Sequence, residues 1–205
     1  MISALDGATG RTTRSCKLGR LLIGSFLILA VAACSSRTPA QLASDALNAG
    51  LEAHTAGNLD EASRRYNECL TQEPSNKYCN YNLGVIAQAQ DRMVEAENYY
   101  RLALATDPNY PPAIFNLAIL RTQAGAEADA IALYRQYVVL KPDDAGGHLN
   151  LGLLLIASGE EAEGQREIAT ATELDPEIQI PASSPLATPT PSATAQASGE
   201  PSPTP

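Results

Sequence analysis

One pattern of 34 residues repeats four times without insertion or deletion, and it constrains the fold more than any other feature of the chain. The copies are residues 43–76, 77–110, 111–144 and 145–178. Position 32 of every copy is a proline: Pro74, Pro108, Pro142 and Pro176. A fixed period of this length indicates a solenoid, because each unit can bury its apolar face only against its neighbours.

Small and large residues also recur at fixed places inside each copy. Position 8 holds Gly50, Gly84, Ala118 and Gly152, and position 20 holds Ala62, Ala96, Ala130 and Gly164. Position 24 holds Tyr66, Tyr100, Tyr134 and Ile168. Small residues let two helices approach closely, and a large residue fills the space beside them. Each copy is therefore predicted to be a helical hairpin that ends at its proline. Position 15, with Gly57, Asp91, Gly125 and Gly159, is expected to be a left-handed residue between the two helices.

This set of residues resembles the tetratricopeptide repeat (TPR) family over all of residues 43–178. The resemblance implies an all-α, right-handed superhelix of four TPR hairpins that binds other proteins. Two positions depart from the family pattern. Position 4 lacks the family's aromatic, and position 11 lacks its tyrosine. Arg121 at position 11 fits least well, because that position is usually buried.

The N-terminal residues 1–33 have the pattern of a secretory signal. A basic stretch that ends at Arg20 precedes the apolar run 21–33, which is too short to span a bilayer comfortably. The run ends in Val-Ala-Ala before Cys34, which resembles the bacterial lipobox. That resemblance implies that Cys34 carries lipid, such as palmitate, and becomes the mature N-terminus. The alternative is an ordinary signal peptide or short anchor beside an incidental cysteine.

Residues 34–42 are interpreted as a lipid-anchored tether and the start of the first helix. Thr38, Pro39 and Gln41 suit the N-cap, the first turn and the third position of a helix. The localisation predicted from the lipobox is a bacterial cell membrane, with the repeats facing the periplasm or extracytoplasmic space. Ser35 and Ser36 permit sorting to an outer membrane by the same analogy.

The charge of the chain argues against nucleic acid as a partner. The formal net charge is −9, and residues 1–33 hold four of the 14 basic and one of the 23 acidic residues. From Cys34 onward there are therefore 10 basic and 22 acidic residues, a net charge of −12. Such a chain is repelled by phosphate backbones.

Cys69 and Cys79 lie five residues before and five residues after Pro74. In two antiparallel helices joined by a turn, such positions face each other, and an extracytoplasmic compartment favours a disulfide. The alternative is two buried cysteines that pack as small hydrophobic residues.

From about residue 179 to 205 the composition changes to Pro, Ala, Ser and Thr, and Glu200 is the one charge after residue 178. No apolar periodicity remains, so this segment is predicted to be a disordered, low-complexity tail. It could be a glycosylated stalk, a docking strand or a plain spacer.

One face of the first helix in each copy carries no charge. Positions 2, 6, 9 and 13 form this stripe, and by resemblance to the family it lines a concave groove. Position 6 is asparagine in every copy, and position 9 is always a branched aliphatic residue. Four amides in a ladder could hold the backbone of an extended peptide. The alternative is that the asparagines serve helix–helix hydrogen bonds. The residues predicted to line the groove are Asn48, Leu51, Tyr81, Asn82, Val85, Phe115, Asn116, Ile119, Asn150 and Leu153.

The sequence gives no sign of catalysis or of a cofactor. His54 and His148 lie three repeats apart, so they do not suggest a metal site, and no phosphate loop or nucleophile motif occurs. We therefore expect a membrane-anchored scaffold, not an enzyme, that binds peptide or helical segments of envelope proteins in its groove. A self-associating structural lipoprotein without a specific client is the alternative. In a third reading, the tail occupies the groove of its own chain.

Overall fold

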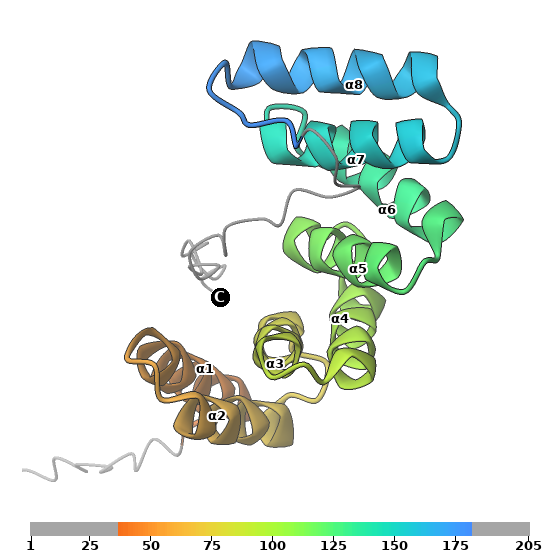
Figure 1. Cartoon of the computed structure of the whole chain (residues 1–205). Coiled ribbons are helices and arrows are strands. Elements are labelled where there is room, and N and C mark those ends of the chain that lie inside the picture. The colour runs from red at the N-terminus through yellow and green to blue at the C-terminus, as the bar shows by residue number, and fades with distance from the viewer. Residues whose placement is uncertain (1–36, 182–205) are drawn as a thin grey trace, which may run out of the picture. The chain divides into compact units, whose positions relative to one another are not determined.

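The computed structural model describes residues 37–181, and the predicted signal, Cys34 and most of the predicted tail lie outside these residues. The described part contains eight α-helices in four antiparallel pairs (Figure 1). They are α1 (Pro39–Thr55), α2 (Leu59–Gln72), α3 (Lys77–Ala89), α4 (Met93–Thr106), α5 (Pro111–Gln123), α6 (Glu127–Leu140), α7 (Ala145–Ala157) and α8 (Glu161–Leu174). The predicted all-α superhelical stack is confirmed.

The helices keep the register of the sequence repeat. From the second copy on, the first helix of each pair begins at the first residue of the copy, at Lys77, Pro111 and Ala145. Each helix packs mainly on its neighbours in the chain, as a solenoid requires.

Local signals in the sequence explain where the helices begin and end. Thr38 caps α1, and its side chain and that of Gln41 form a reciprocal capping box. Between the helices of each pair lies a left-handed residue, as predicted: φ is 76° at Gly57, 59° at Asp91, 71° at Gly125 and 92° at Gly159. Glycine adopts this conformation without steric cost, and aspartate is among the residues that tolerate it best.

Close approach inside each pair depends on the small residue at position 8. A Cβ atom built on Gly84 would lie 2.5 Å from the ring of Tyr100, and one on Gly50 would lie equally close to Tyr66. In the fourth pair the backbones themselves meet, since a Cβ on Gly152 would lie 2.7 Å from the carbonyl oxygen of Gly164. The recurring glycines thus make room for large position-24 side chains or for a neighbouring backbone.

The junctions between successive repeats are filled by three different residue pairs at equivalent places. Position 27 of one repeat and position 3 of the next are Cys69 and Cys79, then Ala103 and Ala113, then Tyr137 and Gly147. All six residues are buried. At the third junction a Cβ on Gly147 would lie 2.6 Å from the Tyr137 ring, so the large residue requires the glycine opposite it.

At the first junction the structure joins Cys69 to Cys79 in a disulfide. The Cα atoms are 6.5 Å apart and both side chains are fully buried. The bond links α2 to α3 and therefore fastens the first repeat to the second.

Replacing both cysteines with alanine is expected to lower the free energy of unfolding by about 2 kcal/mol or less, because the closed loop is short. The variant should still fold, since it recreates the alanine pair of the second junction. Denaturant titration measures the loss, and thiol counting in denatured, oxidised protein tests the bond. Two free thiols there would contradict the disulfide.

Candidate peptide-binding groove

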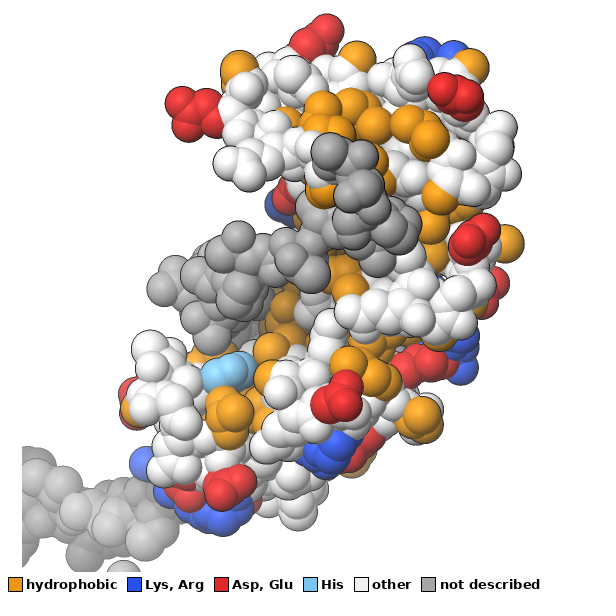
Figure 2. Space-filling model, viewed as in Figure 1, with side chains coloured by type: hydrophobic (Ala, Val, Ile, Leu, Met, Phe, Trp, Pro, Cys, Tyr) orange, Lys and Arg blue, Asp and Glu red, His pale blue; other side chains and the backbone are white. Residues whose placement is uncertain are grey.

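The odd-numbered helices line the concave side of the described stack, and the even-numbered helices lie outside them (Figure 1). Figure 2 shows hydrophobic side chains gathered along this hollowed side. The uncharged stripe of positions 2, 6, 9 and 13 belongs to these inner helices.

The aliphatic residues at position 9 differ in their exposure. Leu51, Val85 and Leu153 are partly exposed, whereas Ile119 is buried. Three of the four predicted aliphatic contacts are therefore accessible for a ligand, in repeats one, two and four.

The four asparagines do not form an even ladder of free amides. Asn48 is exposed, but Asn82 and Asn150 are each 3% exposed. The Asn82 amide donates to the carbonyl oxygen of Tyr78 in its own helix, at 2.8 Å. The Asn116 amide donates across helices to the hydroxyls of Tyr100, at 3.2 Å, and Tyr81, at 3.4 Å. The amides of Asn82 and Asn116 thus serve the protein itself, which supports the helix–helix interpretation for Asn116.

The hydroxyl of Tyr100, at position 24 of the second repeat, explains this use of Asn116. Tyr100 donates to the side-chain oxygen of Gln88 at 2.6 Å and accepts from Asn116 of the next repeat. Burial raises the pKa of the Tyr100 hydroxyl, which stays a neutral donor. The buried hydroxyl of Tyr134 has no hydrogen-bond partner within residues 37–181.

Aromatic rings gather on α3 and α5 in two separate groups, which together we call the aromatic section. The Tyr81 ring packs edge-on against Tyr110 at 5.4 Å between centroids, and Tyr78 packs on the same ring at 5.8 Å. The ring centroids of Phe115 and Tyr137 are 4.8 Å apart. Tyr78, Tyr81 and Phe115 are partly exposed. Tyr81 and Phe115 were predicted from the sequence to line the groove, and Tyr78 lies at position 2 of the predicted stripe. Tyr110 and Tyr137 were not predicted, because positions 34 and 27 lie outside that stripe.

The comparisons with known proteins agree with this geometry. Residues 47–111 match the family model described as tetratricopeptide repeat. A crystal structure of MamA superposes with a TM-score of 0.60 at 19% identity, over 65% of this chain and 78% of that one. The chain has the TPR fold. A MamA fragment from Desulfovibrio magneticus RS-1 gives a TM-score of 0.61 at 21% identity, over 66% and 77% of the two chains. YrrB, described as a TPR protein with an unusual peptide-binding site, gives a TM-score of 0.60 at 20% identity, over 64% of this chain and 68% of that one. No curated protein sequence matches.

The arginine that departs from the TPR pattern is neutralised by its neighbours. Arg121 has 18% of its side chain exposed and forms an ion pair with Glu97 of α4. The Asp129 carboxylate lies 3.9 Å from the Arg121 guanidinium. Position 11 can hold an arginine here because Glu97 of the preceding repeat faces it. The repeat pattern alone does not predict this ion pair.

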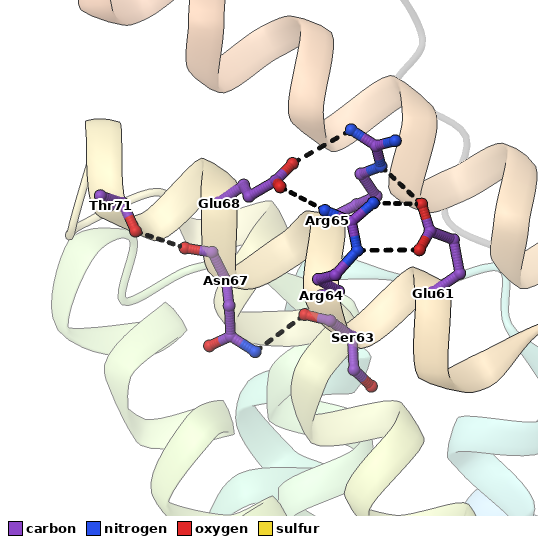
Figure 3. Close-up of polar contacts among 7 residues, drawn as sticks. All are labelled: Glu61, Ser63, Arg64, Arg65, Asn67, Glu68 and Thr71. Carbon is purple, nitrogen blue, oxygen red and sulfur yellow. Dashed lines mark hydrogen bonds and ion pairs between the residues drawn. The ribbon is translucent and has the colours of Figure 1, made fainter. Parts of the chain in front are cut away.

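The outer surface of the TPR stack differs from the groove in its charge. On α2, Arg64 and Arg65 both contact Glu61 and Glu68, forming the network shown in Figure 3. Hydrogen bonds from Arg64 and Arg65 lower the pKa of Glu61 to about 2. This network is exposed, so its contribution to stability is small. Its main consequence is that four of the five charged side chains of α2 already have partners within the helix.

One histidine is buried and the other is partly exposed. His148 is buried between α7 and α8, with Nδ1 2.6 Å from a Glu167 oxygen and Nε2 3.1 Å from the Pro142 carbonyl. His54 Nδ1 lies 3.5 Å from the Tyr66 hydroxyl, and burial lowers the pKa of His54. Within residues 37–181 no group of three or more His, Cys, Asp or Glu is arranged to hold a metal ion. No helix in the same range is both long and apolar enough to cross a bilayer.

Proposed function

We propose that this chain is a membrane-anchored scaffold, not an enzyme, that binds peptide or helical segments of envelope proteins in its TPR groove. The observation that carries the proposal is an uncharged, partly apolar stripe on the inner helices of a stack whose outer helices carry paired charges. An ordinary solvated helix face is charged. Neutral apolar patches beside polar groups suit an extended or helical segment of another protein.

The groove would hold its ligand mainly through apolar and aromatic contacts. Leu51, Val85 and Leu153 supply accessible aliphatic surface, and Tyr81 and Phe115 supply ring faces. Asn48 is the one exposed amide of the ladder, so backbone hydrogen bonds would concentrate at the first repeat. YrrB, described as a TPR protein with an unusual peptide-binding site, supports the proposal.

The proposed anchor is Cys34, which lies outside the described residues. Support for it comes from the signal pattern of residues 1–33 and the lipobox resemblance before the cysteine. Stable attachment requires at least two acyl chains or an equivalent second signal. The proposed location is the extracytoplasmic side of a bacterial inner or outer membrane.

Metabolic labelling with a palmitate analogue tests this anchor. We expect the wild-type chain to carry label and Cys34→Ala to lose it, because the thiol is the acceptor. The replacement also makes the protein leave the membrane fraction or remain as an uncleaved precursor. Equal labelling of both proteins would contradict the proposal.

Self-association through the end of the stack finds little support in the geometry of α8. Glu163 pairs with Arg135 of α6, and Glu167 pairs with His148 of α7, so both face inward. The exposed side of α8 presents Gln165, Arg166 and Glu173, with one exposed large apolar residue, Leu174, at its end. A polar outer face is what a terminal repeat needs to remain soluble without a partner.

The binding proposal is tested by placing charge in the groove. Val85→Glu combined with Leu153→Glu is expected to remove the partner proteins that the wild-type chain captures from solubilised envelopes. Retention of those partners by the variant would place binding elsewhere on the molecule.

A further inference from the structure

The last described residues lead from α8 back toward the inner helices. Figure 1 shows the segment after α8 turning in the direction of α7, which lines the concave side. Ile178 and Pro181 are partly buried, whereas Gln179 and Ile180 are exposed. Another 24 residues, 182–205, follow this point. At about 3.1 Å per residue in the polyproline II conformation they could reach about 70 Å. The four inner helices, each about 10 Å across, span less than that.

The composition of residues 182–205 matches the aromatic section of the groove. The segment contains six prolines and a single charged residue, Glu200. Proline-rich segments form an extended helix whose backbone carbonyls are free to accept hydrogen bonds, and aromatic-lined grooves bind them. Tyr78, Tyr81 and Phe115 offer partly exposed rings there.

Electrostatics also favour residues 182–205, rather than a more acidic segment, as an occupant of the groove. The part from Cys34 onward carries a net charge of −12, so acidic segments are repelled by the surface as a whole. A proline-rich segment with one charged side chain in 24 residues meets little of this repulsion, and the stripe of the groove is itself uncharged.

We propose that residues 182–205 bind in the groove of their own molecule, across the aromatic section formed by α3 and α5. This inference rests on the proposed function, because it assigns the same groove an internal occupant that partner proteins must displace. The groove is then available only to partners that bind more tightly than the tethered segment.

Site-specific photo-crosslinking in the full-length chain tests the inference. A benzophenone amino acid replaces Val85 in one protein and Leu153 in a second, and Val139 on the outer side of α6 serves as control. Val139 is 78% exposed and equally able to accept the probe. We expect peptides from residues 182–205 to be attached to the groove probes within single chains, and not to the control. Circular dichroism checks that each protein is folded.

Changing Pro185, Pro189 and Pro191 to alanine should reduce the yield of this adduct several-fold, because the extended conformation is lost. An undiminished yield would overturn the proline-specific contact. No adduct with residues 182–205, or an adduct only between two chains, would overturn internal binding. These measurements use purified protein without partners. A result that contradicts internal binding therefore leaves the proposed function untouched, because that function is tested separately by capture of envelope proteins.

Discussion

Replacing Tyr100 with alanine is expected to lower the free energy of unfolding by about 3–5 kcal/mol, the usual cost of removing a large buried aromatic side chain. Tyr100 is fully buried at the centre of the second repeat. Its ring fills the space left by Gly84, and no side chain on that glycine can collapse into the cavity. Removing the ring should weaken the packing of α3 on α4. It should also weaken the packing of the second repeat on the first and third, because each repeat is stable only through its neighbours.

Tyr100→Phe is the matched control for this prediction. It keeps the ring and removes only the hydroxyl that bonds Gln88 and Asn116, so we expect a loss of about 1 kcal/mol. Urea titration followed by circular dichroism measures both variants. Equal losses for alanine and phenylalanine would show that the hydroxyl, and not the packed ring, stabilises the repeat.

The repeat pattern was sufficient to predict the architecture from the sequence. The left-handed turn at Asp91 follows from the 34-residue register, and the helices that begin at Lys77, Pro111 and Ala145 keep that register. Such features depend on local sequence and on nearest neighbours. Solenoids contain few contacts between residues that are distant in the sequence, so a local pattern predicts most of the fold.

Contacts between different repeats were harder to predict. The helical periodicity placed Asn82, Asn116 and Asn150 on an open face, but Asn82 and Asn150 are buried and Asn116 bonds Tyr100 of the preceding repeat. The ion pair between Arg121 and Glu97 has the same origin, since its partners are 24 residues apart and belong to different repeats. Helical periodicity shows which side a residue is on, but not how far the next helix overlaps that side.

Introducing two carboxylates into the groove is expected to weaken partner binding at least tenfold. Val85 and Leu153 are partly exposed, so Val85→Glu and Leu153→Glu can keep their charges in water in the free protein and should leave the fold intact. A bound segment would bury those charges against apolar surface without a partner, which costs more than the 1.4 kcal/mol that corresponds to tenfold. Two glutamates introduced on the outer helices should leave partner binding unchanged.

Affinity capture from solubilised envelopes with three proteins tests the central claim that the concave groove binds other proteins. The proteins are the wild type, the groove variant, and an outer variant with Val94→Glu and Val139→Glu, two residues that are each 78% exposed. If the groove is the binding site, the same defined partners appear with the wild type and the outer variant and are lost from the groove variant. Partners retained by the groove variant, or lost equally from both variants, would contradict the claim.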